Sequence, residues 1–398
     1  MKKVWLLKKR VIALAELIGL PRTSMAISAS LERQQPEAPS SVANLQRNRN
    51  EMWESICAVD RITSLMWSLP LGTSNYSILS RPVVDSHGQV NPQAYLYRLT
   101  DIASHIIEQD NVYSSQKSLT DLFSSVMDTD QELRTLAALP PKGWRKLHWT
   151  EPSIDAILQY WHQYLIIRTH LQLALKYYDG QEFAFSFITC LDACQELVRR
   201  YTSMRLVLPA GFFPNRMMDL QAFTASIFLL LTNYGNVRGS SMSLLAVDVN
   251  VTSSLVDQAV QTMRFAAERT GGDFAHQAAD AIYSLNSLLQ QPQASESQKI
   301  SLNLAFVGRV HVSRKACGTG SISNQPHLIP SQQPQEPFHL TTSRDESAGA
   351  ASAVAFKPHN DDLMHSLSYS MEVQENIPFL NDETLGAEQW LTWTGLGT

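Results

Sequence analysis

The chain has 398 residues, of which 44% are hydrophobic and 17% charged, and its formal net charge is −5. This length can bury a sizeable core and allows two or three domains. The small negative charge excludes a protein that binds polyanions through its overall charge.

The charge is distributed unevenly along the chain. Residues 1–50 carry nine Lys or Arg against three Glu, whereas residues 331–398 carry ten Asp or Glu against two basic residues. The basic residues near the start are interpreted either as a solvated helix face, which we favour, or as a nucleic-acid contact or import signal. They form the run Lys2, Lys3, Lys8, Lys9 and Arg10.

Neither a disulfide framework nor a membrane span is indicated. The four cysteines are scattered along the chain, at Cys57, Cys190, Cys194 and Cys317, and the first three are expected to be small buried residues. Charged residues interrupt the apolar N-terminal stretch, so it does not match a secretory signal. The longest uninterrupted apolar run, residues 222–231, is too short to cross a bilayer.

Apolar residues recur at steps of three and four over most of residues 1–290, which predicts helices. Prolines near predicted helix starts and Gly271-Gly272 after a helix support the boundaries. The predicted fold class is all-α, a multi-helix domain of about nine helices with a largely disordered C-terminal tail. The expected helices are residues 2–20, 51–69, 92–110, 115–138, 150–178, 181–203, 214–234, 251–270 and 273–289.

The segments outside these helices are expected to differ in character. Residues 24–50 are predicted to be a loop, and residues 300–312 alternate enough to predict a strand or a short turn. Residues 318–376 are rich in Ser, Gln, Pro and Ala, and we expect disorder because they cannot bury enough apolar surface. Residues 377–398 interleave acidic and bulky apolar residues, a pattern typical of a segment that folds on a partner.

The most informative stretch is residues 51–72, where one charged residue lies within an apolar helical stripe. Asp60 follows Trp53 by seven positions and Ile56 by four, so it shares their face of the helix. A buried carboxylate needs a partner, either Arg61 or a basic residue of another helix. We favour an internal salt bridge that fixes the helix register, and the alternative is a contact with an inducer or a partner.

No constellation of catalytic or metal-binding residues is recognisable. Cys190 and Cys194 lie one helical turn apart but lack two further ligands nearby. His162 and His170 are about 12 Å apart along one predicted helix, too far to share an ion. We therefore predict that the protein is not an enzyme and assign no catalytic, cofactor-binding or metal residue.

A basic run, a Trp, an apolar stretch, Asp-Arg and a turn with Leu-Pro and Gly occur in this order between Arg47 and Gly72. This pattern resembles the signature of the fungal-specific transcription factor domain, the middle homology region of the fungal zinc binuclear cluster regulators. Trp5 to Leu7 and Gly19 to Arg22 resemble the family's preceding helix. The matched signature residues are Trp53, Asp60, Arg61, Ser64, Leu69, Pro70 and Gly72, together with Arg49, Ser55 and Ile56.

The resemblance implies a nuclear transcription regulator, in which a helical regulatory domain transmits or restrains activation. Many members of the family control metabolic or secondary-metabolite gene clusters, so the resemblance implies targets of this kind. The implied division is a regulatory domain at 1–317, a linker at 318–376 and an acidic-aromatic segment at 377–398. Implied partners are the transcription machinery, a DNA-bound partner regulator, a small-molecule inducer and a second copy of the chain. The candidate coactivator contacts are Phe379, Leu380, Trp390 and Trp393.

The chain departs from the family pattern because it has no cluster of six cysteines for zinc, and it begins inside the homology region. Either the domain is truncated at its N-terminus, or the protein contacts DNA only indirectly. Zinc is expected only in the absent DNA-binding module, and an exposed apolar face near Trp5 and Leu6 would be a sign of truncation. The alternative function is a co-regulator that binds a small molecule or protein, with a pocket between the helices predicted at 150–178 and 214–234.

Overall fold

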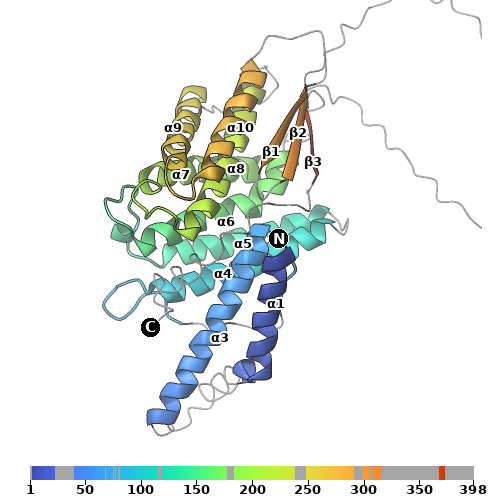
Figure 1. Ribbon diagram of the computed structural model, residues 1–398. Coiled ribbons are helices and arrows are strands. Elements are labelled where there is room, and N and C mark those ends of the chain that lie inside the picture. Colours follow the sequence, from blue (N-terminus) through green and yellow to red (C-terminus); the bar gives the residue numbers. More distant parts are fainter. Residues whose placement is uncertain are drawn as a thin grey trace, which may run out of the picture.

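The computed structural model describes residues 2–22, 40–67, 69–74, 76, 78, 81–114, 119–176, 183–237, 248–290, 299–304, 308–314 and 367–372. Within these ranges the chain forms nine α-helices, one short 3₁₀ helix and three strands (Figure 1). The predominantly helical fold predicted from periodicity is confirmed. The helices are α1 (Lys2–Leu17), α3 (Ser40–Trp67), α4 (Pro92–Ser114), α5 (Leu119–Ala138), η1 (Lys142–Trp144), α6 (Ile154–Lys176), α7 (Ala184–Met204), α8 (Phe213–Val237), α9 (Val249–Ala267) and α10 (Asp273–Gln290).

Most helices pack in layers around one extended core. α6 lies along α7, α7 contacts α8 and α9, and α10 packs on both α8 and α9. On the other side of α6, α4 joins α5 and α3 to this body, and Figure 1 shows α3 and α1 projecting from it at the end opposite α9 and α10. Among the described helices, none combines the length and apolar character needed to cross a membrane.

The helix α3 differs most from its predicted extent. It begins at Ser40, although residues 24–50 were predicted to be a loop and the helix was expected from residue 51. Its first turns include exposed Val42 and Leu45 and carry mostly polar side chains. They have no buried stripe, so the periodicity that predicts a helix is absent there.

A small antiparallel sheet follows the helices. β1 (Lys299–Leu304) pairs with β2 (Gly308–Arg314), so the segment predicted as a strand or turn contributes to a hairpin. β2 also pairs with β3 (Leu367–Glu372), with Arg309 opposite Glu372. β3 lies inside residues 318–376, where we predicted disorder, and the structure corrects that prediction for these residues. The remainder of that range lies outside the described residues.

A second, smaller apolar cluster holds α1 against α3 and is separate from the main core. α1 contributes Ile12 and Ala15 to it, and α3 contributes Trp53, Cys57 and Ala58. Their burial fixes α1 beside the stretch that resembles the family signature, so this cluster positions the candidate site. Its other members are Leu20, Ile78 and Tyr97, with Ile56 and Tyr76 packed against it.

Candidate functional site

Asp60 is at the centre of the junction between α1 and α3 and is only 1% exposed. Its place in the apolar stripe buries it, as the sequence predicts, and this face of α3 meets α1. α3 ends at Trp67, and the backbone NH of Leu69 donates to the carbonyl of Ser64 at 2.9 Å. The chain then folds back, which brings the loop at residues 70–73 against Asp60.

Both oxygens of the Asp60 carboxylate have partners, one through hydrogen bonds and the other through an ion pair. Its Oδ2 atom accepts hydrogen bonds from the backbone NH groups of Gly72 and Thr73, both at 2.9 Å, and from the Thr73 hydroxyl at 2.7 Å. Its Oδ1 atom lies 2.9 Å from Nζ of Lys8 on α1. Three hydrogen bonds and one ion pair compensate the desolvation of this charge.

Lys8 is the counterion of Asp60, and its ammonium group contacts three oxygen atoms. Nζ donates to Ser64 Oγ at 2.7 Å and to the Pro70 carbonyl at 3.3 Å, in addition to its ion pair with Asp60. Two of these three contacts are hydrogen bonds, and the third supplies the opposite charge. Of the two partners predicted for Asp60, the basic residue of another helix is therefore correct. The interpretation of the basic run as a solvated face is wrong for Lys8, which is 8% exposed.

Arg61, the other partner predicted for Asp60, does not serve as its counterion. Its guanidinium forms an ion pair with Asp101 on α4 and donates to the carbonyl of Tyr76 at 2.6 Å. Consecutive residues of a helix point about 100° apart, so Asp60 and Arg61 face different elements. Together the two residues connect α3 to α1 on one side and to α4 on the other.

Gly72 allows the loop after α3 to approach α1 closely. A Cβ atom at this position would lie 2.5 Å from Cδ1 of Ile12, which is buried in the small cluster. A larger residue would push Ile12 away or lift the loop from Asp60. Because Gly72 has no side chain, its backbone NH can reach the Asp60 carboxylate while Ile12 stays packed.

Trp53 and Cys57 form the apolar side of this junction. The ring of Trp53 meets that of Tyr76 edge to face, with centroids 4.9 Å apart. Burial raises the pKa of the Cys57 thiol to about 12, although the nearby Arg61 acts in the opposite direction. The thiol is therefore protonated and behaves as a small apolar group.

The structure brings most of the predicted signature residues together. Trp53, Asp60, Arg61 and Ser64 are buried, and Gly72 is partly buried. Leu69 is partly buried and Pro70 is exposed, and both contribute backbone hydrogen bonds. The Leu69 NH donates to the Ser64 carbonyl, and the Pro70 carbonyl accepts from Lys8. The predicted coactivator contacts Phe379, Leu380, Trp390 and Trp393 lie outside the described residues.

Sequence reasoning missed a second buried ion pair, between α7 and α8. Arg205 Nε donates to Asp219 Oδ1 at 2.7 Å, and Tyr201 donates its hydroxyl proton to the same oxygen at 2.7 Å. Arg205 and Asp219 are 2% and 0% exposed. No distinctive motif surrounds these residues in the sequence. The one available signal was that Arg205 and Asp219 are single charges among mainly apolar neighbours.

The histidines of α6 serve structural contacts. Nδ1 of His162 lies 2.8 Å from the Tyr95 hydroxyl, and burial together with the charges of Arg145 and Arg200 lowers the pKa of His162 to about 3. His170 contacts Asp130 and Ser186, each at 3.2 Å. The two histidines thus have separate partners, as expected from their separation along the helix, although Nε2 of His162 is buried without a hydrogen-bond partner.

Cys190 and Cys194 are buried in α7 and are not in a disulfide. Burial raises the pKa of the Cys194 thiol well above its ordinary value, as expected for a small core residue. Within the described ranges, no group of three or more His, Cys, Asp or Glu side chains could hold a metal ion.

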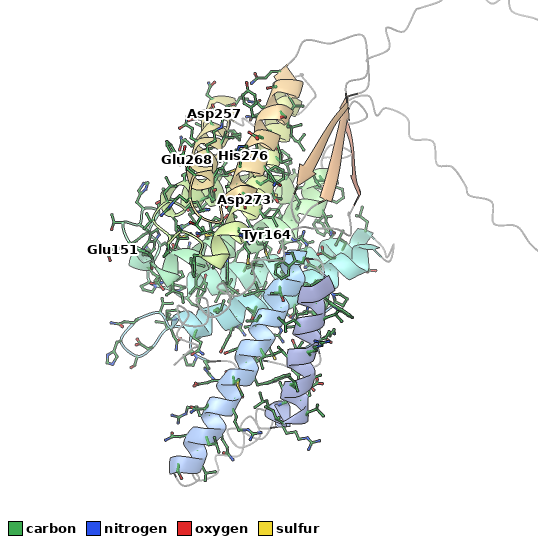
Figure 2. The ribbon with its side chains drawn as sticks, viewed as in Figure 1. Glu151, Tyr164, Asp257, Glu268, Asp273 and His276 are labelled. Carbon is green, nitrogen blue, oxygen red and sulfur yellow. The ribbon has the colours of Figure 1, made fainter. Side chains whose placement is uncertain are left out.

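A small cavity lies between α3, α4, α6 and α8. Its volume is about 20 Å³, and its lining includes Trp161, Tyr164, Met66 and Gln221. Figure 2 shows Tyr164 inside the helical body, with Glu151 at its periphery. The cavity contains aromatic residues of the helix predicted at 150–178, but this volume accommodates about one water molecule. A metabolite would require the surrounding side chains to move.

Comparison with curated proteins gives relatives that are fungal transcription regulators. The chain is 23% identical over 372 residues to the dehydrocurvularin biosynthesis regulator of Alternaria cinerariae, covering 85% of this chain and 46% of the relative. It is 25% identical over 246 residues to the transcription factor sdnS of Sordaria araneosa, covering 58% and 30%. It is 22% identical over 342 residues to the probable transcription factor gsfR1 of Penicillium aethiopicum, covering 82% and 47%.

The chain is thus similar to regulators of fungal gene expression, and these relatives are not named as enzymes. It spans less than half the length of each of these relatives. No family model matches the chain, and no solved structure matches it.

Proposed function

We propose that this chain is the helical regulatory region, or middle homology region, of a fungal transcription regulator of the zinc binuclear cluster type. The observation that carries the proposal is its similarity, over 85% of its length, to a regulator named for the biosynthesis of dehydrocurvularin. By this proposal the protein acts in the nucleus and controls a gene cluster for a secondary metabolite. Other relatives, named as transcription factors, support the same class.

The Asp60 junction supports a regulatory role for the region. The residues that resemble the family signature surround a buried polar centre that joins α1 to α3, while the adjacent Arg61 joins α3 to α4. Buried polar centres of this kind specify one arrangement of helices, because alternative arrangements leave charges unpaired. The proposed role of the signature residues is to fix the relative position of these helices.

DNA recognition by this proposal belongs to a zinc-containing module or to a DNA-bound partner regulator, because residues 1–398 contain no cluster of six cysteines. Coactivators would bind the acidic-aromatic segment at 377–398, through the bulky residues Phe379, Leu380, Trp390 and Trp393. This combination of acidic and aromatic residues is suited to a segment that folds on its partner.

Gene deletion in the source fungus tests the proposed function. Transcripts from one contiguous set of biosynthetic genes should fall, and they should be restored by the wild-type gene. An unchanged transcriptome, measured under conditions in which the protein is produced, would contradict the proposal.

A reporter assay tests the proposed activating tail separately. Residues 318–398 fused to an unrelated DNA-binding domain should activate a reporter gene, and the double variant Trp390→Ala/Trp393→Ala should lose that activity. Phe338→Ala, an aromatic substitution outside 377–398, is the matched control and should retain it. A fusion without activity would remove the tail from the proposed mechanism.

A further inference from the structure

α1 is apolar on two faces, and the described part of the chain covers one of them. Ile12 and Ala15 are buried against α3, whereas Leu7, Leu14 and Leu17 on the other side are 64%, 61% and 83% exposed. We define the α1 outer face by these three residues together with Val11 and Ile18, which are 41% and 59% exposed. A contiguous apolar surface of this kind marks an interaction site.

The spacing on this face is suited to packing against another segment. Leu7, Val11, Leu14 and Ile18 follow one another at steps of four, three and four, as residues do in a seam between helices. The amide of Ile18 continues the helical pattern by donating to the carbonyl of Leu14 at 3.0 Å. The face therefore extends over about 16 Å at 1.5 Å per residue.

Basic side chains flank the α1 outer face. Arg10 is exposed three positions after Leu7 and four before Leu14, so it borders the apolar stripe. Arg49 of α3 donates to the carbonyl of Ile18 at 2.6 Å, and Arg47, two positions earlier in α3, is exposed. Over residues 2–22 and 40–67, nine Lys or Arg stand against four Asp or Glu. The face favours an occupant with bulky apolar and acidic residues.

The opposite end of the helical body has the opposite charge. Residues 248–290, which include α9 and α10, contain five Asp or Glu against two Arg. Figure 2 shows Asp257 and Glu268 in this part of the molecule, away from α1, and Asp273 nearer the middle of the helical body. An acidic segment is therefore disfavoured beside α9 and α10 and favoured beside α1.

We propose that the acidic-aromatic segment at 377–398 of the same chain docks on the α1 outer face. The segment contains Asp382, Glu383 and Glu388 and has no Lys or Arg. Its large apolar residues match the exposed leucines, and its carboxylates match the basic flank. A second copy that packed its own α1 and α3 here is a poorer occupant, because two basic surfaces would then face and repel each other. The large apolar residues are Phe379, Leu380, Leu385, Trp390, Leu391 and Trp393.

The consequence of docking rests on the proposed function. Residues held on α1 are withheld from coactivators, so release of the segment would increase activation. The docking itself is a physical contact that is measurable without any transcription assay.

Zero-length carbodiimide cross-linking of the full chain tests the contact. We expect amide links between the N-terminal lysines, above all Lys3, which precedes Leu7 by four positions and so shares its face, and the carboxylates of 377–398. An equal mixture of unlabelled and ¹⁵N-labelled protein should give only links between peptides of the same label, which defines docking within one copy. Hydrogen exchange should also show protection of 377–398 in the full chain.

Substitutions on α1 provide the specificity test. Leu7→Gln/Leu14→Gln should reduce cross-links and protection about tenfold, equivalent to ~1.4 kcal/mol. Phe265→Gln on α9 is the matched control, because Phe265 is similarly exposed at 58%, and it should have no effect. Links between differently labelled peptides would replace the proposal with a contact between two copies. Absence of both links and protection, or equal values in the α1 variant, would overturn it.

The reporter assay separates this inference from the proposed function. Cross-links in the full chain, together with an inactive 318–398 fusion, would leave the docking correct and refute the activating tail. An active fusion, together with no cross-links or protection in the full chain, would refute the docking alone.

Discussion

The substitution Asp60→Asn would test whether the ion pair with Lys8 holds α1 in place. It keeps the size of the side chain but removes the charge that lies 2.9 Å from Lys8 Nζ. The amide has one oxygen, which can serve either Lys8 or the three donors of Gly72 and Thr73. In either orientation, an amide NH₂ group faces donors and leaves buried polar groups without partners.

The expected cost follows from the burial of both charges. The side chains of Lys8 and Asp60 are 7% and 0% exposed, and removal of one partner from a buried pair typically costs about 3–5 kcal/mol. Urea denaturation followed by far-ultraviolet circular dichroism should show this loss as a lower midpoint. Hydrogen exchange should show that residues 2–22 lose protection, since their polar attachment to α3 is weakened.

Two further variants make the measurement specific. Asp280→Asn removes a carboxylate from an exposed pair with His276, and it should leave the midpoint nearly unchanged because exposed pairs contribute little. Lys8→Met/Asp60→Asn should be less destabilised than Asp60→Asn alone, because no unpaired ammonium remains. A change below about 1 kcal/mol for Asp60→Asn would refute a buried, paired Asp60.

Four other predictions concern the junction, the core and the cavity. Gly72→Ala should destabilise the protein by about 1–3 kcal/mol through its contact with Ile12. Gly143→Ala, where no atom lies within 4 Å of the added Cβ, should not change the urea midpoint, and equal effects would refute the close approach. The pKa of His162 falls from 6.5 to about 3 on folding, so the folded state favours neutral imidazole. Its contribution to stability is present above pH 6.5 and is lost toward pH 3, at about 1.4 kcal/mol per pH unit. Urea midpoints should therefore depend on pH between 6.5 and 5 more steeply in the wild type than in His162→Gln, and parallel curves would contradict this assignment. Arg205→Met leaves Asp219 buried without its counterion and should cost about 3–5 kcal/mol, whereas Arg264→Met on the exposed side of α9 should have little effect in the same assay. Ala103→Val places a larger side chain in the cavity of about 20 Å³, and the thermal midpoint should change by only a few degrees. A drop greater than about 10 °C would show that this space is already filled.

The helices could largely be predicted because their signals are local. The stripes of α6, α9 and α10 follow from residues three and four positions apart, and the observed ends lie within a few residues of the predicted ones. The start of α3 escaped prediction because its first turns project from the body and bury no stripe. β3 escaped prediction because its pairing with β2 joins residues more than fifty positions apart.

The sequence by itself determined that a helix passes through residues 51–67 and that Asp60 shares its buried face. The helical period sets which residues lie together, and a charge within an apolar stripe must find a partner. Only the tertiary structure decided that Lys8 is this partner and that Arg61 turns to Asp101. These pairs join residues 52 and 40 positions apart, and which side chains meet depends on how whole helices pack, a choice that no local pattern encodes.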